Sequence, residues 1–323
     1  MPILLTGAAG FIGFHIATAL LGRGEQIIGV DDLNPYYDVR LKQARLSQLI
    51  ERRNFCFHQI DIADRSSMAA LAARESGITR IVHLAAQAGV RHSLTDPHAY
   101  VSANMMGHLV VLEAARALPH LEHLVFASSS SVYGANSALP FAEQDRVDTP
   151  QSLYAASKLA DELMSYSYAH LFGIRQTALR FFTVYGPWGR PDMAYYSFAN
   201  AIMKGEPITL YDGGTLRRDF TYIDDIVTGV LGVLDRPPEN VPPMRVLNIG
   251  NHRSEPVSAL VALLERELGH RADIRFAARP PADVVETFAD ITRIAELTGF
   301  APATPLEAGI PRFVAWFRRW RNG

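Results

Sequence analysis

The sequence predicts an α/β protein built on a doubly wound parallel sheet, with a smaller, mostly C-terminal α/β region beside it. Two observations support this prediction. Over the first two-thirds of the chain, short apolar runs rich in β-branched residues alternate with amphipathic segments, and a glycine-rich turn follows the first run directly. Strands and helices in alternation form a parallel sheet that is covered on both faces. A chain of 323 residues, 48% of them hydrophobic, can fill the core that such a sheet needs.

Each strand expected in the main sheet is a short apolar run. These runs cover residues 3–5, 26–30, 55–60, 80–84, 123–127 and 177–182. The segments between them repeat apolar residues at helical spacing, which is typical of helices that pack on a sheet. They cover residues 11–21, 66–74, 99–117 and 152–172.

The alternation breaks after residue 182. A stretch with glycine and proline at 185–192 precedes a helical pattern at 195–204 and a strand at 208–212. A helix is expected at 224–234, and a strand at 245–249 could return to the first sheet before a further helix at 257–268. We therefore expect residues 1–180 plus about 223–250 to form one domain, and about 181–222 plus 251–323 to form a second region.

The C-terminal segment 313–321 is basic and aromatic. This composition has two interpretations, a helix on a membrane surface or a final helix that packs its apolar stripe on the domain. We favour packing on the domain, because it needs no further assumption.

Composition narrows the class of protein. The 31 basic and 33 acidic residues give a net charge of −2, which offers no reason to expect a nucleic acid or an anionic membrane as partner. No apolar run approaches the ~18 residues that span a bilayer and no signal-peptide pattern is present, so a soluble, cytoplasmic protein is expected. The single cysteine, Cys56, cannot form an internal disulfide and is predicted to be buried. The histidines lack the spacing of a zinc site, so no metal is expected, and His120 and His123 are expected to be solvated.

Three glycines mark a turn of the dinucleotide-binding type directly after the first strand. Gly7, Gly10 and Gly13 have GxxGxxG spacing, and Phe11 and Ile12 open the helix that follows. Glycine permits the tight turn, the approach of backbone to a pyrophosphate and the close contact of helix with strand. The N–H groups at the helix N-terminus can then bind phosphate oxygens. The spacing alone is a weak signal, but the strand before it and the helix after it predict a Rossmann-like fold.

Further candidate cofactor contacts follow the next strands, at the sheet edge where ligands bind in such folds. Asp31 ends the second strand and is expected to bind the adenosine ribose hydroxyls. A carboxylate at this position repels a 2′-phosphate, so NAD is favoured over NADP. Asp32 is the competing candidate. The other expected contacts are Asp61, Ile62, Leu84, Ala85, Ala86 and Gln87.

A tyrosine and a lysine four residues apart form the candidate chemical centre. Tyr154 and Lys158 occupy one face of the helix expected at 152–172, so a phenol lies near an ammonium. A nearby positive charge stabilises the phenolate and brings the tyrosine pKa toward neutral, so that more of the side chain is ionised and can act as a base. On spacing alone, the pair could equally be a coincidence on a solvated face.

Five motifs, taken in order, resemble those of the extended short-chain dehydrogenase/reductase family of nucleotide-sugar enzymes, and the resemblance covers essentially the whole chain. The motifs are Gly7-x-x-Gly10-x-x-Gly13, His83-Leu84-Ala85-Ala86, the serine run with its Tyr-Gly at 128–134, Tyr154-x-x-x-Lys158, and 180–187. More narrowly, the segments 32–38, 185–194 and 218–225 look like those of the UDP-glucuronate 4-epimerases.

The resemblance implies a reaction in which bound NAD is not consumed. Tyr154 takes the proton of the sugar 4-hydroxyl while hydride leaves C4, and the 4-keto sugar turns over before reduction on its other face. Lys158 binds the nicotinamide ribose and lowers the Tyr154 pKa. Ser129 hydrogen-bonds the 4-oxygen, with Ser130 beside it.

The resemblance also assigns the substrate contacts. Arg190 is expected to hold the sugar carboxylate, with Thr183 at the position where hexose epimerases have Asn, and Arg218 to hold the pyrophosphate. Arg91 is a further substrate contact, and Asp283 is expected at the uridine ribose. In the family, helices equivalent to 99–117 and 152–172 form a four-helix bundle, so a homodimer is expected.

Three other functions stay open at this stage. A UDP-glucose 4-epimerase and a UDP-glucuronate decarboxylase belong to the same family; the decarboxylase pattern has an acid two residues before the serine-run tyrosine, where this chain has Ser131. The alternative interpretation of Arg190 is a surface arginine of the loop that carries glycine and proline. From a different class, the chain could be a non-catalytic NAD-binding sensor, since this fold serves several functions.

Overall fold

The main sheet of the computed structural model, which describes residues 1–280 and 284–322, has seven strands in the order β11-β6-β5-β4-β1-β2-β3. All neighbouring strands in it are parallel. The strands are β1 (Pro2–Thr6), β2 (Gln26–Asp31), β3 (Phe55–Gln59), β4 (Arg80–His83), β5 (His123–Ser129), β6 (Gln176–Phe181) and β11 (Met244–Ile249). The predicted doubly wound parallel sheet is confirmed, and β11 does return to it beside β6.

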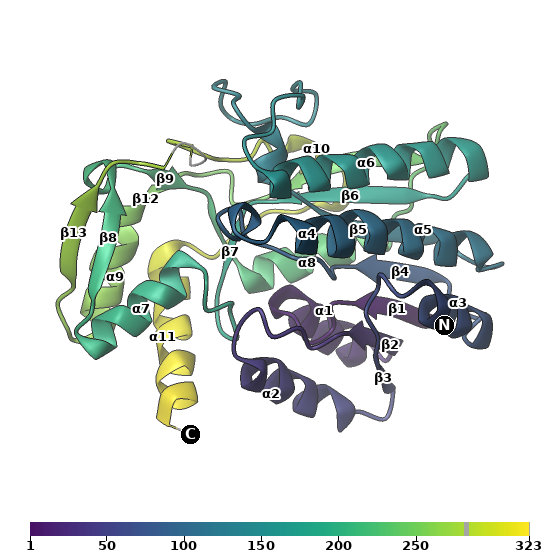
Figure 1. Cartoon of the computed structure of the whole chain (residues 1–323), viewed down its shortest axis with the longest axis horizontal. Coiled ribbons are helices and arrows are strands. Elements are labelled where there is room, and N and C mark those ends of the chain that lie inside the picture. The colour runs from purple at the N-terminus through teal and green to yellow at the C-terminus, as the bar shows by residue number, and fades with distance from the viewer. Residues whose placement is uncertain (281–283, 323) are drawn as a thin grey trace.

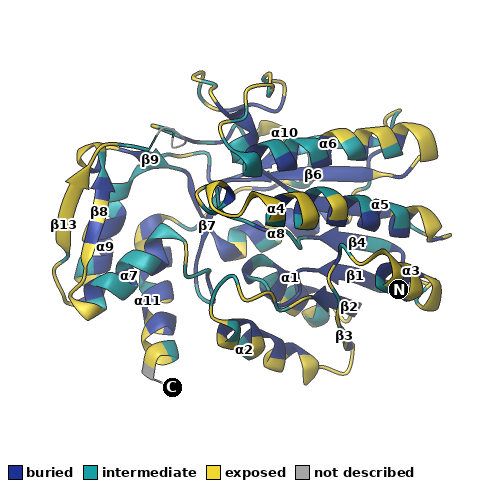
Figure 2. Ribbon diagram, viewed as in Figure 1, coloured by how far each residue is buried: buried dark blue, intermediate teal, exposed yellow. Residues whose placement is uncertain are grey.

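Helices cover both faces of this sheet (Figure 1). One face carries α3 (Arg65–Arg74), α5 (Gly107–Ala117) and α6 (Leu153–Phe172); the other carries α1 (Phe11–Gly22), α2 (Val39–Ile50), α8 (Ile223–Leu234) and α10 (Thr292–Thr298). The central strands are therefore buried on both sides (Figure 2), which explains their continuous apolar runs. The helix expected at 99–117 is interrupted, because α4 (Pro97–Tyr100) passes through a π-helical turn, η2 (Val101–Met106), into α5.

Within the described residues, part of the chain after β6 builds the smaller region, whereas α8, β11 and α10 return to the main sheet. The smaller region contains α7 (Ala194–Lys204), α9 (Val257–Leu268), α11 (Leu306–Asn322), and three two-stranded sheets. These sheets pair β7 (Thr183–Tyr185) with β10 (Phe220–Tyr222), β9 (Arg217–Arg218) with β12 (Glu255–Pro256), and β8 (Pro207–Tyr211) with β13 (Asp273–Ala277). Short 3₁₀ turns occur at η1 (His92–Leu94), η3 (Ser130–Tyr133) and η4 (Asp212–Gly214). β13 is exposed along its length (Figure 2).

The last helix, α11, packs its apolar stripe on the domain, as predicted. Phe313 and Phe317 are completely buried, and Phe313 meets the Tyr195 ring of α7 edge-on at 4.9 Å between centroids. Trp316 packs against Trp188, with the ring planes tilted by 48° and the centroids 5.3 Å apart. The aromatic residues of the segment therefore complete the core. Among the helices within residues 1–280 and 284–322, none is long and apolar enough to cross a membrane.

Two expectations drawn from local sequence are wrong. Cys56 is exposed, because β3 is the edge strand and only its other side, with Phe55, packs on the core; the Cys56 sulfur lies 3.4 Å from His58 Nε2 instead. His123 is buried at the start of β5, where its ring bonds the Leu234 carbonyl and the Thr177 hydroxyl. Burial lowers the His123 pKa to about 4, so this ring is a neutral core group.

Replacing Phe313 by Ala should lower the free energy of unfolding by about 3–5 kcal/mol, because the substitution leaves a cavity in the core around α11. Urea unfolding followed by circular dichroism measures the change. Phe276→Ala is the matched control, since that ring is 65% exposed on β13, and its effect should stay below about 1 kcal/mol. Equal effects of the two substitutions would contradict the packing described for α11.

Candidate active site

A cavity of about 870 Å³ runs along the carboxyl ends of the sheet strands and into the smaller region. Every predicted site residue in the described part of the chain lines it. Asp283 lies outside the described residues. The cofactor candidates along its wall are Gly7, Gly10, Phe11, Ile12, Gly13, Asp31, Asp61, Ile62, Leu84, Ala85, Ala86 and Gln87; the others are Arg91, Ser129, Ser130, Tyr154, Lys158, Thr183, Arg190 and Arg218.

The glycine turn leaves no room for side chains. A Cβ on Gly13 would lie 2.0 Å from the Gly7 carbonyl oxygen, and Gly7 has a φ of +73°. The Gly10 N–H closes the turn by donating to the Gly7 carbonyl at 2.9 Å. The N-cap of α1, Gly10, offers no side-chain acceptor, so the N–H groups of the first helical turn stay available to an anionic ligand.

Asp31 is fixed beside this turn by backbone hydrogen bonds. Its carboxylate accepts from the Ala9 N–H at 3.1 Å and from the Leu33 N–H at 2.9 Å. The ammonium of Lys42, on α2, lies 3.6 Å from Asp31 and 4.0 Å from Asp32. Asp31 is buried and Asp32 is exposed, and both line the cavity. A carboxylate oriented in this way can accept hydrogen bonds from a ribose.

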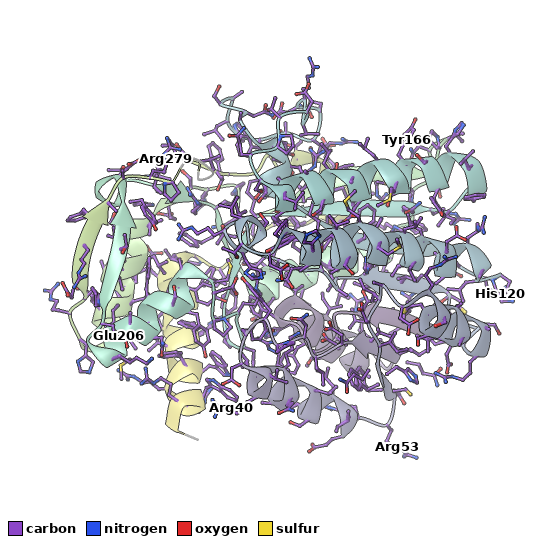
Figure 3. The ribbon with its side chains drawn as sticks, viewed as in Figure 1. Arg40, Arg53, His120, Tyr166, Glu206 and Arg279 are labelled. Atoms are coloured by element: carbon purple, nitrogen blue, oxygen red, sulfur yellow. The ribbon has the colours of Figure 1, made fainter. Side chains whose placement is uncertain are left out.

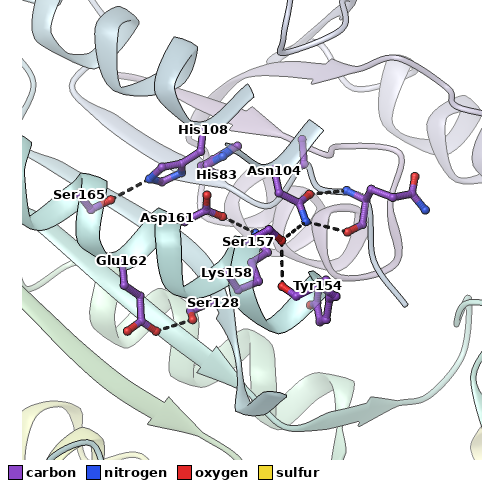
Figure 4. Close-up of polar contacts among 12 residues, drawn as sticks. His83, Asn104, His108, Ser128, Tyr154, Ser157, Lys158, Asp161, Glu162 and Ser165 are labelled. Carbon is purple, nitrogen blue, oxygen red and sulfur yellow. Dashed lines mark hydrogen bonds and ion pairs between the residues drawn. The ribbon is translucent and has the colours of Figure 1, made fainter. Parts of the chain in front are cut away.

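The Tyr154 and Lys158 side chains come from the first two turns of α6 (Figure 4). Ser152 caps this helix, since its hydroxyl accepts from the Ala155 N–H at 3.1 Å. Tyr154 is half-buried, and its ring meets Tyr100 edge-on at 6.0 Å between centroids. Both side chains line the cavity. The Lys158 ammonium is paired with the Asp161 carboxylate at 3.0 Å. This ion pair was not predicted from the sequence.

The serine run spans the end of β5 and the start of η3, and its side chains have two roles. Ser128 points into the fold, where its hydroxyl donates to Glu162 at 2.5 Å, and Glu162 in turn holds Arg180 through both carboxylate oxygens. Ser129 and Ser130 line the cavity. The Ser129 hydroxyl accepts from the Ser131 N–H at 3.2 Å, so its position is fixed by its own turn.

Arg190 lies in the cavity, paired with an internal carboxylate. Its Nε donates to Asp192 Oδ1 at 3.1 Å and its Nη2 to Asp192 Oδ2 at 2.5 Å. Asp192 also accepts from the Tyr36 hydroxyl at 3.3 Å. The pairing uses one edge of the guanidinium, and a guanidinium has five N–H donors in all. The other edge can still bind a second carboxylate or hydroxyl.

The remaining candidates, Arg91, Arg218 and Thr183, also line the cavity. The Arg91 guanidinium lies over the Tyr211 ring of β8, 4.9 Å from its centroid, and so connects the two regions. Arg218 is half-buried on β9, with Nη1 donating to the Arg217 carbonyl at 2.8 Å. Thr183 is the first residue of β7 and is half-buried. Arg91 and Arg218 can serve an anionic group of a ligand in the cavity.

Five residues of the site had no assigned role in the sequence interpretation. They are Tyr36, Lys42, Arg45, Asp161 and Asp192. Tyr36 and Asp192 belong to segments whose resemblance was noted, so their position in those motifs was an available signal. Lys42 and Arg45 interrupt the apolar stripe of α2 formed by Leu41 and Leu49, and a charge in such a stripe indicates a buried polar contact.

The chain is similar to a defined group of proteins. The model of the "NAD dependent epimerase/dehydratase family" matches residues 3–250. "UDP-glucuronate 4-epimerase 3" of Arabidopsis thaliana is 43% identical over 334 residues, with 99% of this chain and 77% of the relative covered. A "Probable UDP-glucuronate 4-epimerase" of Rhizobium meliloti is 44% identical and covers 98% of this chain and 97% of its own length. In structure, a UDP-glucuronic acid 4-epimerase from Bacillus cereus in complex with UDP-glucuronic acid and NAD has a TM-score of 0.92 at 33% identity, with 99% and 100% of the two chains covered.

Replacing Gly13 by Ala should prevent NAD binding, because the new Cβ cannot lie 2.0 Å from the Gly7 carbonyl and the turn must open. Calorimetric titration of the cofactor-free protein with NAD measures the loss. Gly22→Ala, in the same helix, is the control, since no atom lies within 4 Å of the added Cβ. NAD binding of normal strength by the Gly13 variant would show that the turn does not hold the cofactor.

Proposed function

The chain belongs to the NAD dependent epimerase/dehydratase family, and from this premise we propose that it is a UDP-glucuronate 4-epimerase. The observation that supports this best is the placement of Arg190 in one cavity with Tyr154 and the glycine turn. The guanidinium offers a partner for a sugar carboxylate, and the phenol offers a base for the sugar 4-hydroxyl. The product would be UDP-galacturonate.

The residues along the sheet edge fit NAD. The glycine turn excludes any Cβ, the first turn of α1 presents N–H groups, and Asp31 is aligned to accept from ribose hydroxyls. When bound, NAD supplies the acceptor and donor of the hydride at sugar C4. The Asp31 carboxylate disfavours a 2′-phosphate, so NAD is preferred over NADP.

Tyr154 removes the proton of the 4-hydroxyl and later returns it to the 4-oxygen of the other epimer. The Lys158 ammonium stabilises the phenolate and donates to the nicotinamide ribose. Ser129, held by its own turn, donates to the 4-oxygen, with Ser130 beside it. Because the 4-keto sugar must rotate before reduction, the cavity has to hold the UDP moiety firmly and the sugar loosely.

Arg190 and Thr183 hold the sugar carboxylate in this proposal. A 4-keto uronate is a β-keto acid, and it loses CO₂ more readily when its carboxylate is desolvated. Charge-assisted hydrogen bonds from the free edge of the Arg190 guanidinium oppose that loss. Ser131, in place of an acid, leaves the serine run without the proton donor that the decarboxylase pattern carries. Both features favour epimerisation.

The smaller region binds the UDP moiety. We propose that Arg218 and Arg91 contact the diphosphate, and that Asp283 contacts the uridine ribose. In this proposal residues 1–180 plus about 223–250 form the NAD-binding domain, and about 181–222 plus 251–323 the nucleotide-sugar-binding region.

We further propose a cytoplasmic homodimer. Exposed apolar side chains gather on the helices expected to form its interface, with Leu163 and Tyr166 on α6 and Val101 and Met106 on η2. Tyr166 projects outward from α6 (Figure 3). Burying these side chains in a bundle of four helices would remove them from water.

Incubation with UDP-glucuronate should yield UDP-galacturonate without added NAD, because the cofactor is regenerated in each turnover. Separation of the sugar nucleotides by chromatography identifies the product. Tyr154→Phe should lower kcat by about 10²–10⁴-fold through loss of the base. Tyr166→Phe, on the exposed side of the same helix, should not change kcat. A pentose nucleotide as the sole product would indicate a decarboxylase, and tight NAD binding without turnover would indicate a sensor.

Removing the Arg190 guanidinium should lower kcat/KM for UDP-glucuronate roughly ten- to hundredfold, and turnover of UDP-glucose much less, since only the uronate needs a charged partner. Arg190→Ala alone leaves the Asp192 carboxylate unpaired, where it would repel the substrate. The double variant Arg190→Ala/Asp192→Asn removes this repulsion and gives the cleaner comparison. Arg218→Ala, the control, should weaken both substrates alike. Unchanged uronate turnover in the double variant would reject the carboxylate assignment.

A further inference from the structure

The Lys158 ammonium carries an internal counterion. Asp161, one turn further along α6, accepts from Lys158 Nζ at 3.0 Å, and the two side chains are only 4% and 0% exposed (Figure 4). Asp161 Oδ1 has no hydrogen-bond partner within residues 1–280 and 284–322. Tyr154, Lys158 and Asp161 are spaced i, i+4, i+7, so they occupy one face of the helix. A buried carboxylate is therefore bonded to the ammonium on the helix face that also carries Tyr154.

No other positive charge takes the place of Lys158 in the described surroundings of Asp161. His83 on β4 and His108 on α5 are the titratable groups across from α6, and they bond Thr6 and Ser165 respectively. Burial lowers the pKa of His83 to about 3 and the pKa of His108 well below its ordinary value, so both rings are neutral.

The neighbouring acid has its own partners. Glu162 bonds Ser128 and is paired with Arg180 of β6 through both carboxylate oxygens. Asp161 therefore depends on Lys158 for its charge compensation. Burial raises the Asp161 pKa to about 6, although the ammonium beside it opposes this rise.

This arrangement changes what Lys158 can do for Tyr154. An ammonium lowers the pKa of a nearby phenol through its positive potential, and a carboxylate bonded to the ammonium offsets part of that potential. An ammonium has three donors, and Asp161 takes one of them. Two donors remain for ligand oxygens in the cavity.

We propose that Asp161 is a positioning residue that anchors the Lys158 ammonium and, through its negative charge, sets the base strength of Tyr154. This inference rests on the proposed function only in taking Tyr154 as the base. At neutral pH the carboxylate is ionised for the most part, and its negative charge offsets part of the positive potential of the Lys158 ammonium.

Two neutral replacements separate the charge of Asp161 from its anchoring role. Asp161→Asn keeps the shape and an acceptor oxygen, and Asp161→Ser removes the charge and most of the reach. Asp161 lies seven residues, or about 10 Å, from Tyr154 along the helix. At that separation, loss of the negative charge should lower the Tyr154 pKa by about half to one unit in both variants. Asp273→Asn, on exposed β13, is the matched control.

The shift is measured in two ways on the NAD-saturated protein. Titration of tyrosinate absorbance, with the corresponding Tyr154→Phe protein subtracted, reports the Tyr154 pKa and needs no sugar substrate. The acid limb of kcat/KM should move to lower pH by the same amount, so that below the wild-type pKa each variant is roughly three- to tenfold more active relative to its own plateau. NAD binding should weaken in Asp161→Ser and persist in Asp161→Asn, because only the latter keeps an acceptor for the ammonium.

An unchanged or raised Tyr154 pKa in both variants would overturn the proposal. Unchanged NAD affinity in Asp161→Ser would overturn its anchoring part. Failure of the proposed function has a different signature, since Tyr154→Phe would then remain active or wild type would not turn over UDP-glucuronate, while the absorbance titration would still report on Asp161.

Discussion

A single buried guanidinium connects the cofactor turn with the loop that carries Arg190. Arg45, on α2, is completely buried, and its Nη1 donates to the Ala9 carbonyl of the glycine turn at 3.0 Å. Its Nη2 donates to the Trp188 and Gly189 carbonyls at 2.7 and 3.2 Å. An arginine cannot lose its charge in a protein, so it can be buried only where several acceptors surround it. The positions of these backbone segments are therefore mutually dependent.

This connection matters because the loop at 186–193 has no helix or strand of its own. Its second fixed point is His15 of α1, whose Nε2 lies 3.0 Å from the Pro187 carbonyl. Burial lowers the His15 pKa to about 4, so the ring stays neutral and donates to that carbonyl. Side chains of α1 and α2, which pack on the main sheet, thus hold the loop that carries Arg190. A change at the glycine turn can reach the loop that carries Arg190 through a few hydrogen bonds.

The fold class and the glycine turn could be predicted from the sequence, because both depend on local patterns of residues. Short stretches of the sequence already show apolar patterns typical of strands or of helices, and these patterns alternate along the chain. The glycine spacing reflects contacts within a single turn. The partners of the functional cations are harder to find. Asp192 is only two residues from Arg190, yet its second partner, Tyr36, is 156 residues away. The helix α2 was not predicted from the sequence, because Lys42 and Arg45 break its apolar stripe. The acceptors that hold these two side chains lie on other elements of the fold. The exposure of Cys56 also depends on the order of the strands, because β3 lies at the edge of the sheet. The residues of a strand do not determine its place in the sheet.

The two cations proposed to act beside the sugar and the nicotinamide ribose, Arg190 and Lys158, are each paired with a nearby carboxylate. Lys158 is paired with Asp161 three residues on, and Arg190 is paired with Asp192 two residues on. Each internal carboxylate comes from its cation's own segment, so the charged group is oriented before any ligand arrives. Each pair is close to neutral, so neither cation attracts an anion with its full charge. Recognition of an anionic sugar must then depend on the free N–H donors of each cation and on their directions. A neutral sugar would leave those donors without a charged partner, whereas a correctly placed carboxylate would satisfy them.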